Sequence, residues 1–182
     1  MRTATLLRAG PAVWTAPILL PALVWFSAQN TDPTITYWPS ISSQTTIVVG
    51  FVSAACGAAA AWEASRVERG GITALAPARG LLGVAVLHLG PIAVLGLIAM
   101  IAPFAVVTAS VAFTSGFPNP AILAVSFSVI LAHIALGWFF GTRMPQFLGA
   151  ATMLIFGYLW GLWPAAIGAL PWLRHLNGQG VS

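Results

Sequence analysis

The chain has 182 residues, of which 59% are hydrophobic and only 5% are charged. Its mean hydropathy of +0.93 excludes a water-soluble globule, because so few polar residues cannot cover a folded surface. The net charge of +4 comes from seven widely spaced arginines with no lysine, which excludes the basic stripe of a nucleic-acid-binding protein.

Five apolar runs are long enough to cross a bilayer as helices. We expect spans at residues 12–28, 44–62, 80–101, 120–140 and 147–163. Helices satisfy their own backbone hydrogen bonds within the lipid, and no other open structure does so. The predicted fold class is therefore all-α, a polytopic transmembrane helical bundle that forms one domain over residues 1–182.

The first run follows Arg2 and Arg8, as expected for an N-terminal span. A cleaved signal peptide has the same order of basic residues and apolar core, and is the alternative. The second run is rich in small residues such as Gly50 and Gly57, which predicts close contact with other helices. Cys56 in this run has no cysteine partner and is interpreted as a packing residue.

The third apolar stretch, from residue 80 to about residue 115, is too long for one simple crossing. Pro91 and Pro103 predict a kinked span that ends near residue 101 and continues as a tilted or separate outer segment. The fifth run carries Gly157 and Gly161, a small-residue pair at the spacing of helix contacts.

The arginines predict the orientation of the bundle. Under the five-span topology one side carries Arg2, Arg8, Arg66, Arg69, Arg79 and Arg143, and the other carries only Arg174. By the positive-inside rule the N-terminus is cytoplasmic and the C-terminus lies outside, after a short outer interfacial helix at residues 164–174. The expected location is a bacterial-type inner or plasma membrane, with multiple spans.

One charged island, residues 63–79, separates the second and third spans. It holds two of the three carboxylates and three of the seven arginines, at Glu63, Arg66, Glu68, Arg69 and Arg79. Ile72 and Leu75 follow at helical spacing, so the island can be a short amphipathic helix on the inner membrane surface that docks on a partner. The alternative is a solvated loop whose arginines only enforce topology.

The island resembles the cytoplasmic coupling segment of ATP-binding cassette (ABC) transporter permeases of the type-2 exporter class. The residues that carry the resemblance are Glu68-Arg69, a glycine, Thr73, Leu75, Pro77 and Arg79. In that family a Glu-Arg pair, a Gly-Thr, a leucine and Pro-x-x-Arg occupy this position; here Ile72 interrupts the Gly-Thr pair and Pro77 is two residues from Arg79. Family members have a sixth span, whereas this sequence stops at Ser182, as a fragment or a shortened relative would.

The resemblance implies a permease subunit that pairs with a second permease subunit and has no catalytic centre of its own. ATP and Mg would be bound by a separate ABC ATPase subunit. This ATPase would dock on the island at Glu63, Arg66, Glu68, Arg69 and Arg79 and couple hydrolysis to transport or mechanical work. The residues agree, because a P-loop requires a lysine and the chain has none.

Two histidines suggest a competing function. His88 lies eight residues after Gly80 and His133 eight before Gly141, so both are expected about 12 Å from the cytoplasmic end. Such a pair could ligate a b-type haem in a membrane cytochrome subunit, or each ring could simply bond a neighbouring helix. No acid pair is expected within the membrane, which disfavours a carboxylate proton relay. A non-catalytic assembly subunit of a larger membrane complex is the third alternative.

Overall fold

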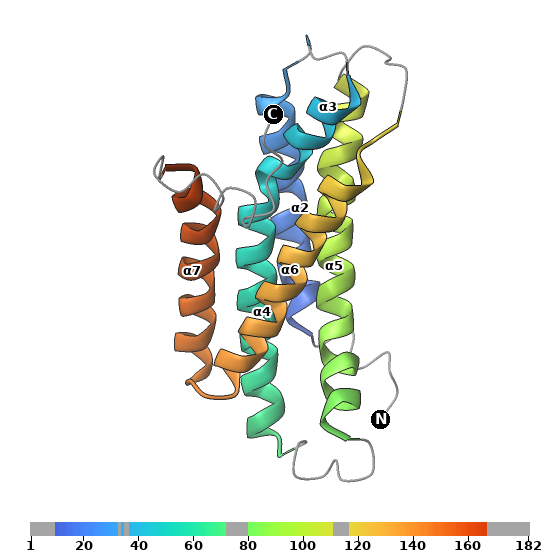
Figure 1. Cartoon of the computed structure of the whole chain (residues 1–182). Helices are drawn as coiled ribbons and strands as arrows, with labels where there is room; N and C mark the ends of the chain where they lie inside the picture. Colours follow the sequence, from blue (N-terminus) through green and yellow to red (C-terminus); the bar gives the residue numbers. More distant parts are fainter. Residues whose placement is uncertain (1–9, 33, 35–36, 72–79, 111–116, 167–182) are drawn as a thin grey trace.

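The computed structural model describes residues 10–32, 34, 37–71, 80–110 and 117–166. Within these ranges the elements are α2 (Pro11–Asn30), α3 (Trp38–Thr45), the 3-10 helix η1 (Thr46–Val48), α4 (Val49–Arg69), α5 (Gly80–Ser110), α6 (Pro120–Gly141) and α7 (Gln146–Ala166) (Figure 1). Four helical segments of the described chain are long and apolar enough to span a membrane, and α7 is a further apolar helix. The expected all-α membrane bundle is confirmed.

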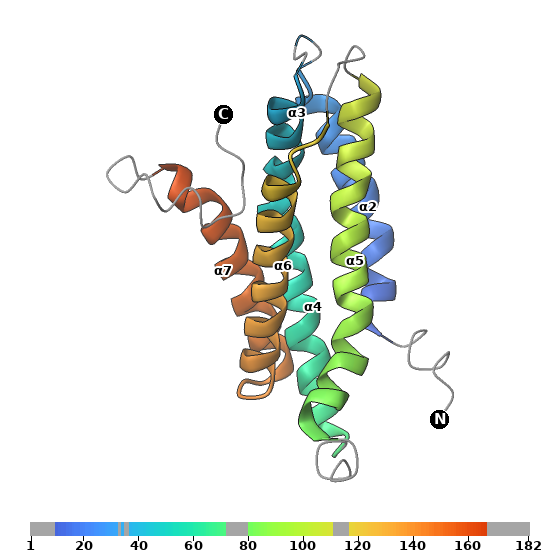
Figure 2. The ribbon, with the colours of Figure 1, turned by 45° about the vertical axis from the view of Figure 1, so that its right-hand side comes forward.

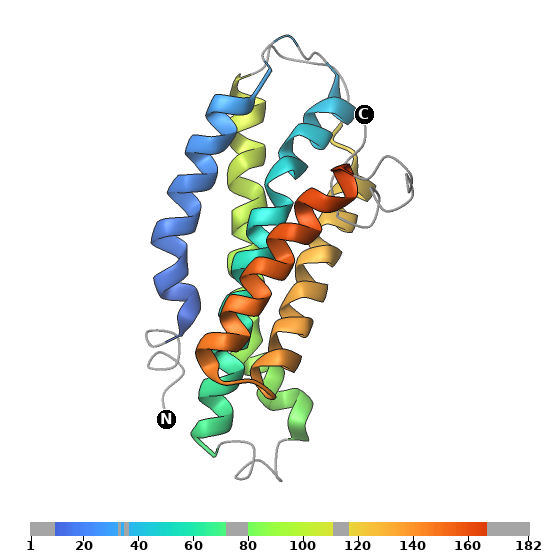
Figure 3. The same cartoon turned by 90° about the vertical axis from the view of Figure 1, so that its left-hand side faces the viewer.

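Helix α4 is the centre of the bundle. The pair α2 and α5 contacts one side of α4, and the pair α6 and α7 contacts the other (Figures 1 and 3). In the most apolar stretch of the α3–α4 segment 72% of residues are buried, against 17% to 39% in the other three candidate spans. A helix in this position has protein rather than lipid on most of its surface, which explains its small residues.

The second span is longer at both ends than the predicted 44–62. The helical segment starts at Trp38, with a proline in its first turn, where a missing N–H costs no hydrogen bond. The polar residues there stay helical, since hydroxyls such as that of Thr45 donate to a backbone carbonyl three residues earlier. The helix ends at Arg69, and Gly71 then adopts a φ of +63°, which glycine tolerates without strain.

The third span continues as a single helix to Ser110, so the predicted end near residue 101 is wrong. Its 31 residues extend over about 46 Å, well beyond a hydrocarbon core of about 30 Å. Pro91 and Pro103 lie inside this helix without ending it. Membrane helices tolerate proline because neighbouring helices and local adjustments satisfy the freed backbone groups. The predicted outer segment is thus the continuation of the same helix.

The fourth and fifth spans follow the prediction closely. Helices α6 and α7 start within one residue of the predicted positions 120 and 147. Helix α7 continues to Ala166, so the first residues of the predicted outer interfacial helix belong to the span. Residues 167–174 of that predicted helix lie outside the described residues.

Small residues bring α4 and α7 into backbone contact. A Cβ atom on Gly157 would lie 2.6 Å from the Cα of Ala54, and one on Gly161 would lie 2.7 Å from the Cα of Gly50. The two helices run antiparallel, so one small-x-x-x-small pair lies directly on the other. The predicted helix contact at the glycine pair of the fifth run is confirmed.

The same device joins α4 to α6. A Cβ atom on Gly137 would overlap the backbone carbonyl of Gly57, and one on Gly141 would overlap the backbone of Ala61. The side-chain hydroxyl of Ser65 donates to the carbonyl of Gly141 at 2.5 Å, one turn further along α4. Helix α4 therefore packs against both α6 and α7 through close backbone contacts.

Helix α6 begins with a side-chain cap that supports a stability prediction. The Asn119 carboxamide oxygen accepts from the backbone N–H of Ala121 at 3.0 Å, and the Asn119 N–H donates to the Ser42 hydroxyl at 3.0 Å. We expect Asn119→Ala to lower the free energy of unfolding by about 1 kcal/mol, because the first N–H groups of the helix lose their acceptor. Equilibrium unfolding in detergent micelles measures this, with Ser128→Ala on the exposed face of α6 as the control. Equal stability of the two variants would contradict the capping role.

Candidate functional site

Glu63 lies inside the bundle rather than on the membrane surface. Its side chain is only 2% exposed, and it shares the buried face of α4 with Cys56, Ala60 and Val67. These positions recur at intervals of three, four and seven residues, the spacing of one helix face. Glu63 is therefore not exposed for the expected contact with a docked partner: α4 continues helically through residue 63 and turns this carboxylate inward.

The carboxylate of Glu63 joins α4 to α5. Its Oε1 atom lies 2.7 Å from Nδ1 of His88 on α5 and accepts from the Arg66 guanidinium at 2.7 Å. His88 is 9% exposed, whereas the Arg66 side chain is 35% exposed and reaches toward the outside of the bundle. A carboxylate bonded to an imidazole and a guanidinium is the most polar contact in this apolar interior, so it marks the candidate site.

One hydrogen-bond acceptor in the Glu63–His88–Arg66 cluster has no donor among the described residues. The Oε2 atom of Glu63 is buried and has no hydrogen-bond partner among the described residues. A cavity of about 350 Å³ borders the cluster, with Glu63 and His88 as its polar wall. A buried carboxylate oxygen without a donor costs free energy, so such an atom beside a cavity points to a binding function.

The other charged residues of the island lie at the end of α4. Glu68 and Arg69 are exposed there. The Arg69 guanidinium donates to the backbone carbonyl of Ser65 and to the side-chain oxygen of Gln146, at the start of α7. Arg69 thus braces the corner between α4 and α7 as well as presenting a charge. Arg79, with the rest of residues 72–79, lies outside the described residues.

Arginine side chains gather at this end of the bundle. Arg66 and Arg69 lie on the last turns of α4, and Arg143 lies in the turn between α6 and α7, its guanidinium 3.8 Å from the centre of the Phe139 ring. We call this the arginine end. The described chain also enters here, since Gly10 and Pro11 border the same cavity as Glu63. The third carboxylate, Asp32, follows the far end of α2, where hydrogen bonds from the Thr34 hydroxyl and N–H lower its pKa.

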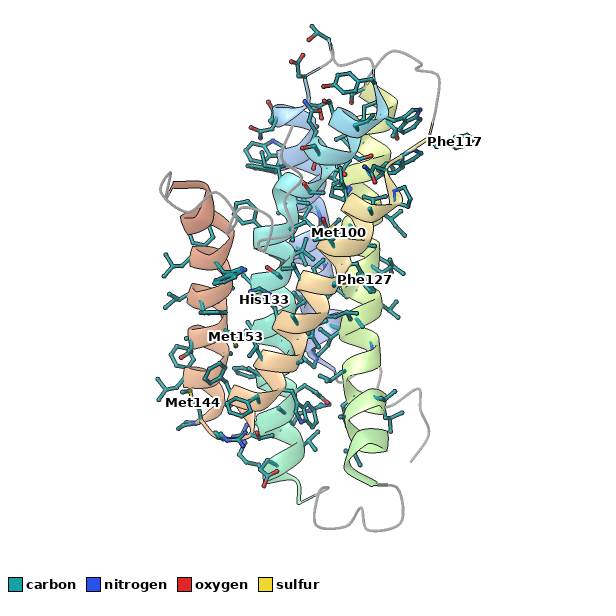
Figure 4. The ribbon with its side chains drawn as sticks, in the orientation of Figure 1. Met100, Phe117, Phe127, His133, Met144 and Met153 are labelled. Carbon is teal, nitrogen blue, oxygen red and sulfur yellow. The ribbon has the colours of Figure 1, made fainter. Side chains whose placement is uncertain are left out.

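The haem hypothesis expected the two histidines at matching depth, but the structure places them at different depths. The carbonyl of His133 faces Gly57, at 3.2 Å from a Cβ placed there, whereas His88 faces Glu63, six residues or about 9 Å further along α4. They also face different neighbours: His133 lies beside Phe156 of α7, midway along the bundle (Figure 4). His133 Nδ1 bonds the carbonyl of Val129 in its own helix. The two histidines therefore have different neighbours and do not lie at the expected matching depth.

The sequence did not predict the Glu63–His88 pair, because it placed Glu63 on the membrane surface and His88 within a span. A signal was available: the chain folds back on itself between α4 and α5, and residues 63 and 88 lie at similar distances from that turn. Residues equidistant from a helical hairpin turn face each other when their helix phases agree. The apolar residues at helical spacing around Glu63 indicated that it lies on the buried face of its helix.

The comparisons with known proteins add no relative. No protein-family model, no curated protein and no solved structure matches this chain. Its function must therefore be inferred from its residues and their arrangement.

Proposed function

We propose that this chain is the membrane-spanning permease subunit of an ABC transporter of the type-2 exporter class. A separate ATPase subunit binds ATP and Mg, docks on the exposed tip of α4 formed by Glu68 and Arg69, and moves α4. A second permease subunit, identical or different, completes the transport path. In this role the chain performs no hydrolysis; it converts a movement at one membrane surface into a change of the whole bundle.

The observation that carries the proposal is the position of the charged tip on the central helix. Glu68 and Arg69 lie at the exposed end of α4, and further back the same helix touches α6 at Ala61 and α7 at Ala54 backbone to backbone. A displacement of this tip would be carried to the neighbouring helices, because the glycine contacts leave little side-chain volume between them. It would be transmitted to α6 and α7 as a rigid-body shift.

The distribution of arginines supports the orientation in this proposal. Three of the described arginines lie at the arginine end, and Arg2, Arg8 and Arg79 belong to segments that adjoin it in sequence. Cytoplasmic loops are enriched in arginine, so the arginine end faces the cytoplasm and the N-terminus is cytoplasmic. The chain then leaves α7 on the outer side of a bacterial-type inner membrane.

Charge reversal at the tip of α4 tests the docking. We expect the double variant Glu68→Arg/Arg69→Glu to lower co-purification of the ATPase by about tenfold, because contacts between oppositely charged side chains become repulsive. The measurement is the ratio of ATPase to permease after affinity purification of the tagged, full-length chain from membranes.

Two control variants separate docking from folding. Gln146→Ala removes the internal partner of Arg69 and keeps its charge, and Arg143→Glu reverses a charge at the same end but in the α6–α7 turn. Both should retain the ATPase. Unchanged association in the double variant, with normal insertion, would contradict the coupling role and favour an assembly subunit instead.

A further inference from the structure

A cavity of about 350 Å³ lies between the first turn of α2, the last turns of α4 and the arginine-end half of α5. Figure 2 shows α2 running alongside α5 in this region. Apart from Glu63 and His88, the wall is formed by α2 residues 10–13 and by Val86, Leu87, Pro91 and Ile92 of α5. Val86 is 69% exposed and Leu87 is 40% exposed, so the cavity opens on the lipid-facing side of α5.

The first acceptor in this cavity is Glu63 Oε2. Arg66 and His88 both bond Oε1, which leaves Oε2 buried and without a donor in the described chain. The His88 ring adds a second acceptor in the tautomer whose Nδ1 donates to Glu63, because Nε2 then carries the lone pair. Both side chains line the cavity.

The third acceptor comes from the backbone of α5. Pro91 has no N–H, so the carbonyl of Leu87, four residues earlier, lacks its normal helical donor. Both residues line the cavity: Leu87 is next to His88, and Pro91 follows about one turn later. The Glu63 carboxylate and the His88 ring therefore lie in the wall of one cavity, with the Leu87 carbonyl on the same turn of α5 as His88, and Oε2 has no donor among the described residues.

We propose that this cavity binds the protonated primary amine of a small amphiphile, with the apolar part of the ligand against α2 and α5. A primary ammonium carries three N–H donors, which match the three acceptors, and its charge is attracted by the carboxylate. Arg66 bonds Oε1 of Glu63 from a side chain that is 35% exposed, which leaves Oε2 to the ligand. The site needs no ATPase partner, so it stands or falls independently of the transport proposal.

The amine can come from two sources with the same chemistry. One is a free apolar amine that enters from the bilayer, and the other is the headgroup of phosphatidylethanolamine, which also carries a primary ammonium. Both would place the N–H groups at Glu63 and the apolar part along Val86 and Pro91.

The test is a binding experiment with 4-fluorobenzylamine, followed by ¹⁹F NMR on the full-length chain in nanodiscs of phosphatidylcholine and phosphatidylglycerol. We expect saturable binding above that of empty nanodiscs. The 4-fluorobenzyl trimethylammonium analogue, which has the charge without N–H donors, and 4-fluorobenzyl alcohol should each bind about tenfold more weakly or less. Equal binding of all three probes would overturn the proposal.

Variants locate the binding. Glu63→Gln should weaken 4-fluorobenzylamine binding by about tenfold or more, since it removes the charge beside the donors, whereas Glu68→Gln, a carboxylate outside the cavity, should leave it unchanged. If Glu63→Gln does not fold, Val86→Trp keeps Glu63 and fills the open side of the cavity from an exposed position. Full binding in Val86→Trp would exclude this cavity as the site.

Replacing phosphatidylcholine by phosphatidylethanolamine identifies the source. If the lipid amine occupies the site, the apparent affinity for 4-fluorobenzylamine falls in wild-type protein through competition. If it stays unchanged, the site takes free amines. Both results support an amine site, while absence of saturable binding in either lipid mixture overturns it.

Discussion

Replacing Gly137 by leucine should separate α6 from α4 and lower the free energy of unfolding by about 3 kcal/mol or more. Even a Cβ atom at this position overlaps the carbonyl of Gly57, and a backbone group cannot rotate away as a side chain would. Helix α6 would have to shift outward along the whole contact, which also carries Gly141 against Ala61. Unfolding of the purified chain in mixed micelles by increasing SDS, followed by tryptophan fluorescence, measures the change.

Gly83→Ala is the matched control for this variant. Gly83 lies within α5, and a Cβ atom there has no neighbour within 4 Å. Alanine is the better helix former, by roughly 0.5–1 kcal/mol, so this variant should be as stable as the wild type or slightly more stable. If Gly137→Leu behaves like Gly83→Ala, the two helices are not in backbone contact.

Removing His88 should be the most costly single change at the candidate site. His88→Leu leaves the buried Glu63 carboxylate with only Arg66 as a partner, and we expect a loss of about 3 kcal/mol. Glu63→Leu should cost less, because it removes the buried carboxylate and leaves an Arg66 side chain that can turn to the exposed side. The double variant Glu63→Leu/His88→Leu should be close to Glu63→Leu alone, since no unpaired charge remains.

The same SDS unfolding experiment on the four proteins forms a double-mutant cycle. A coupling free energy between Glu63 and His88 well above the error, with the double variant more stable than His88→Leu, is the expected result. Strictly additive losses would show that the two side chains do not interact in the membrane.

The corrected role of Glu63 also changes which residues are available to a partner. Of the five island residues, Glu68 and Arg69 form the exposed tip, Arg66 is shared between the surface and Glu63, and Glu63 belongs to the interior. Docking and amine binding can therefore be tested by separate variants, because one uses the tip of α4 and the other its buried face.

Composition and hydropathy determined the fold class of this protein and the approximate position of its spans. A chain this apolar must bury its backbone polar groups in helices, and each helix must be long enough for the bilayer. The small-residue pair at Gly157 and Gly161 also predicted its helix contact correctly, because only residues without bulk allow two backbones to approach. The predicted helix ends were less accurate, as at Ser110. Prolines and hydroxyls that break helices in water are tolerated in a membrane bundle.

Only the tertiary structure shows which polar and charged side chains lie together in one candidate site. Glu63 reads as part of a surface island in sequence, but the phase of α4 turns it inward, and the return of α5 brings His88 within 2.7 Å. His88 and His133 read as a pair, yet they contact different parts of α4. Sequence spacing measures depth only along one helix; the shift and rotation of neighbouring helices, set by glycine contacts, determine which side chains meet.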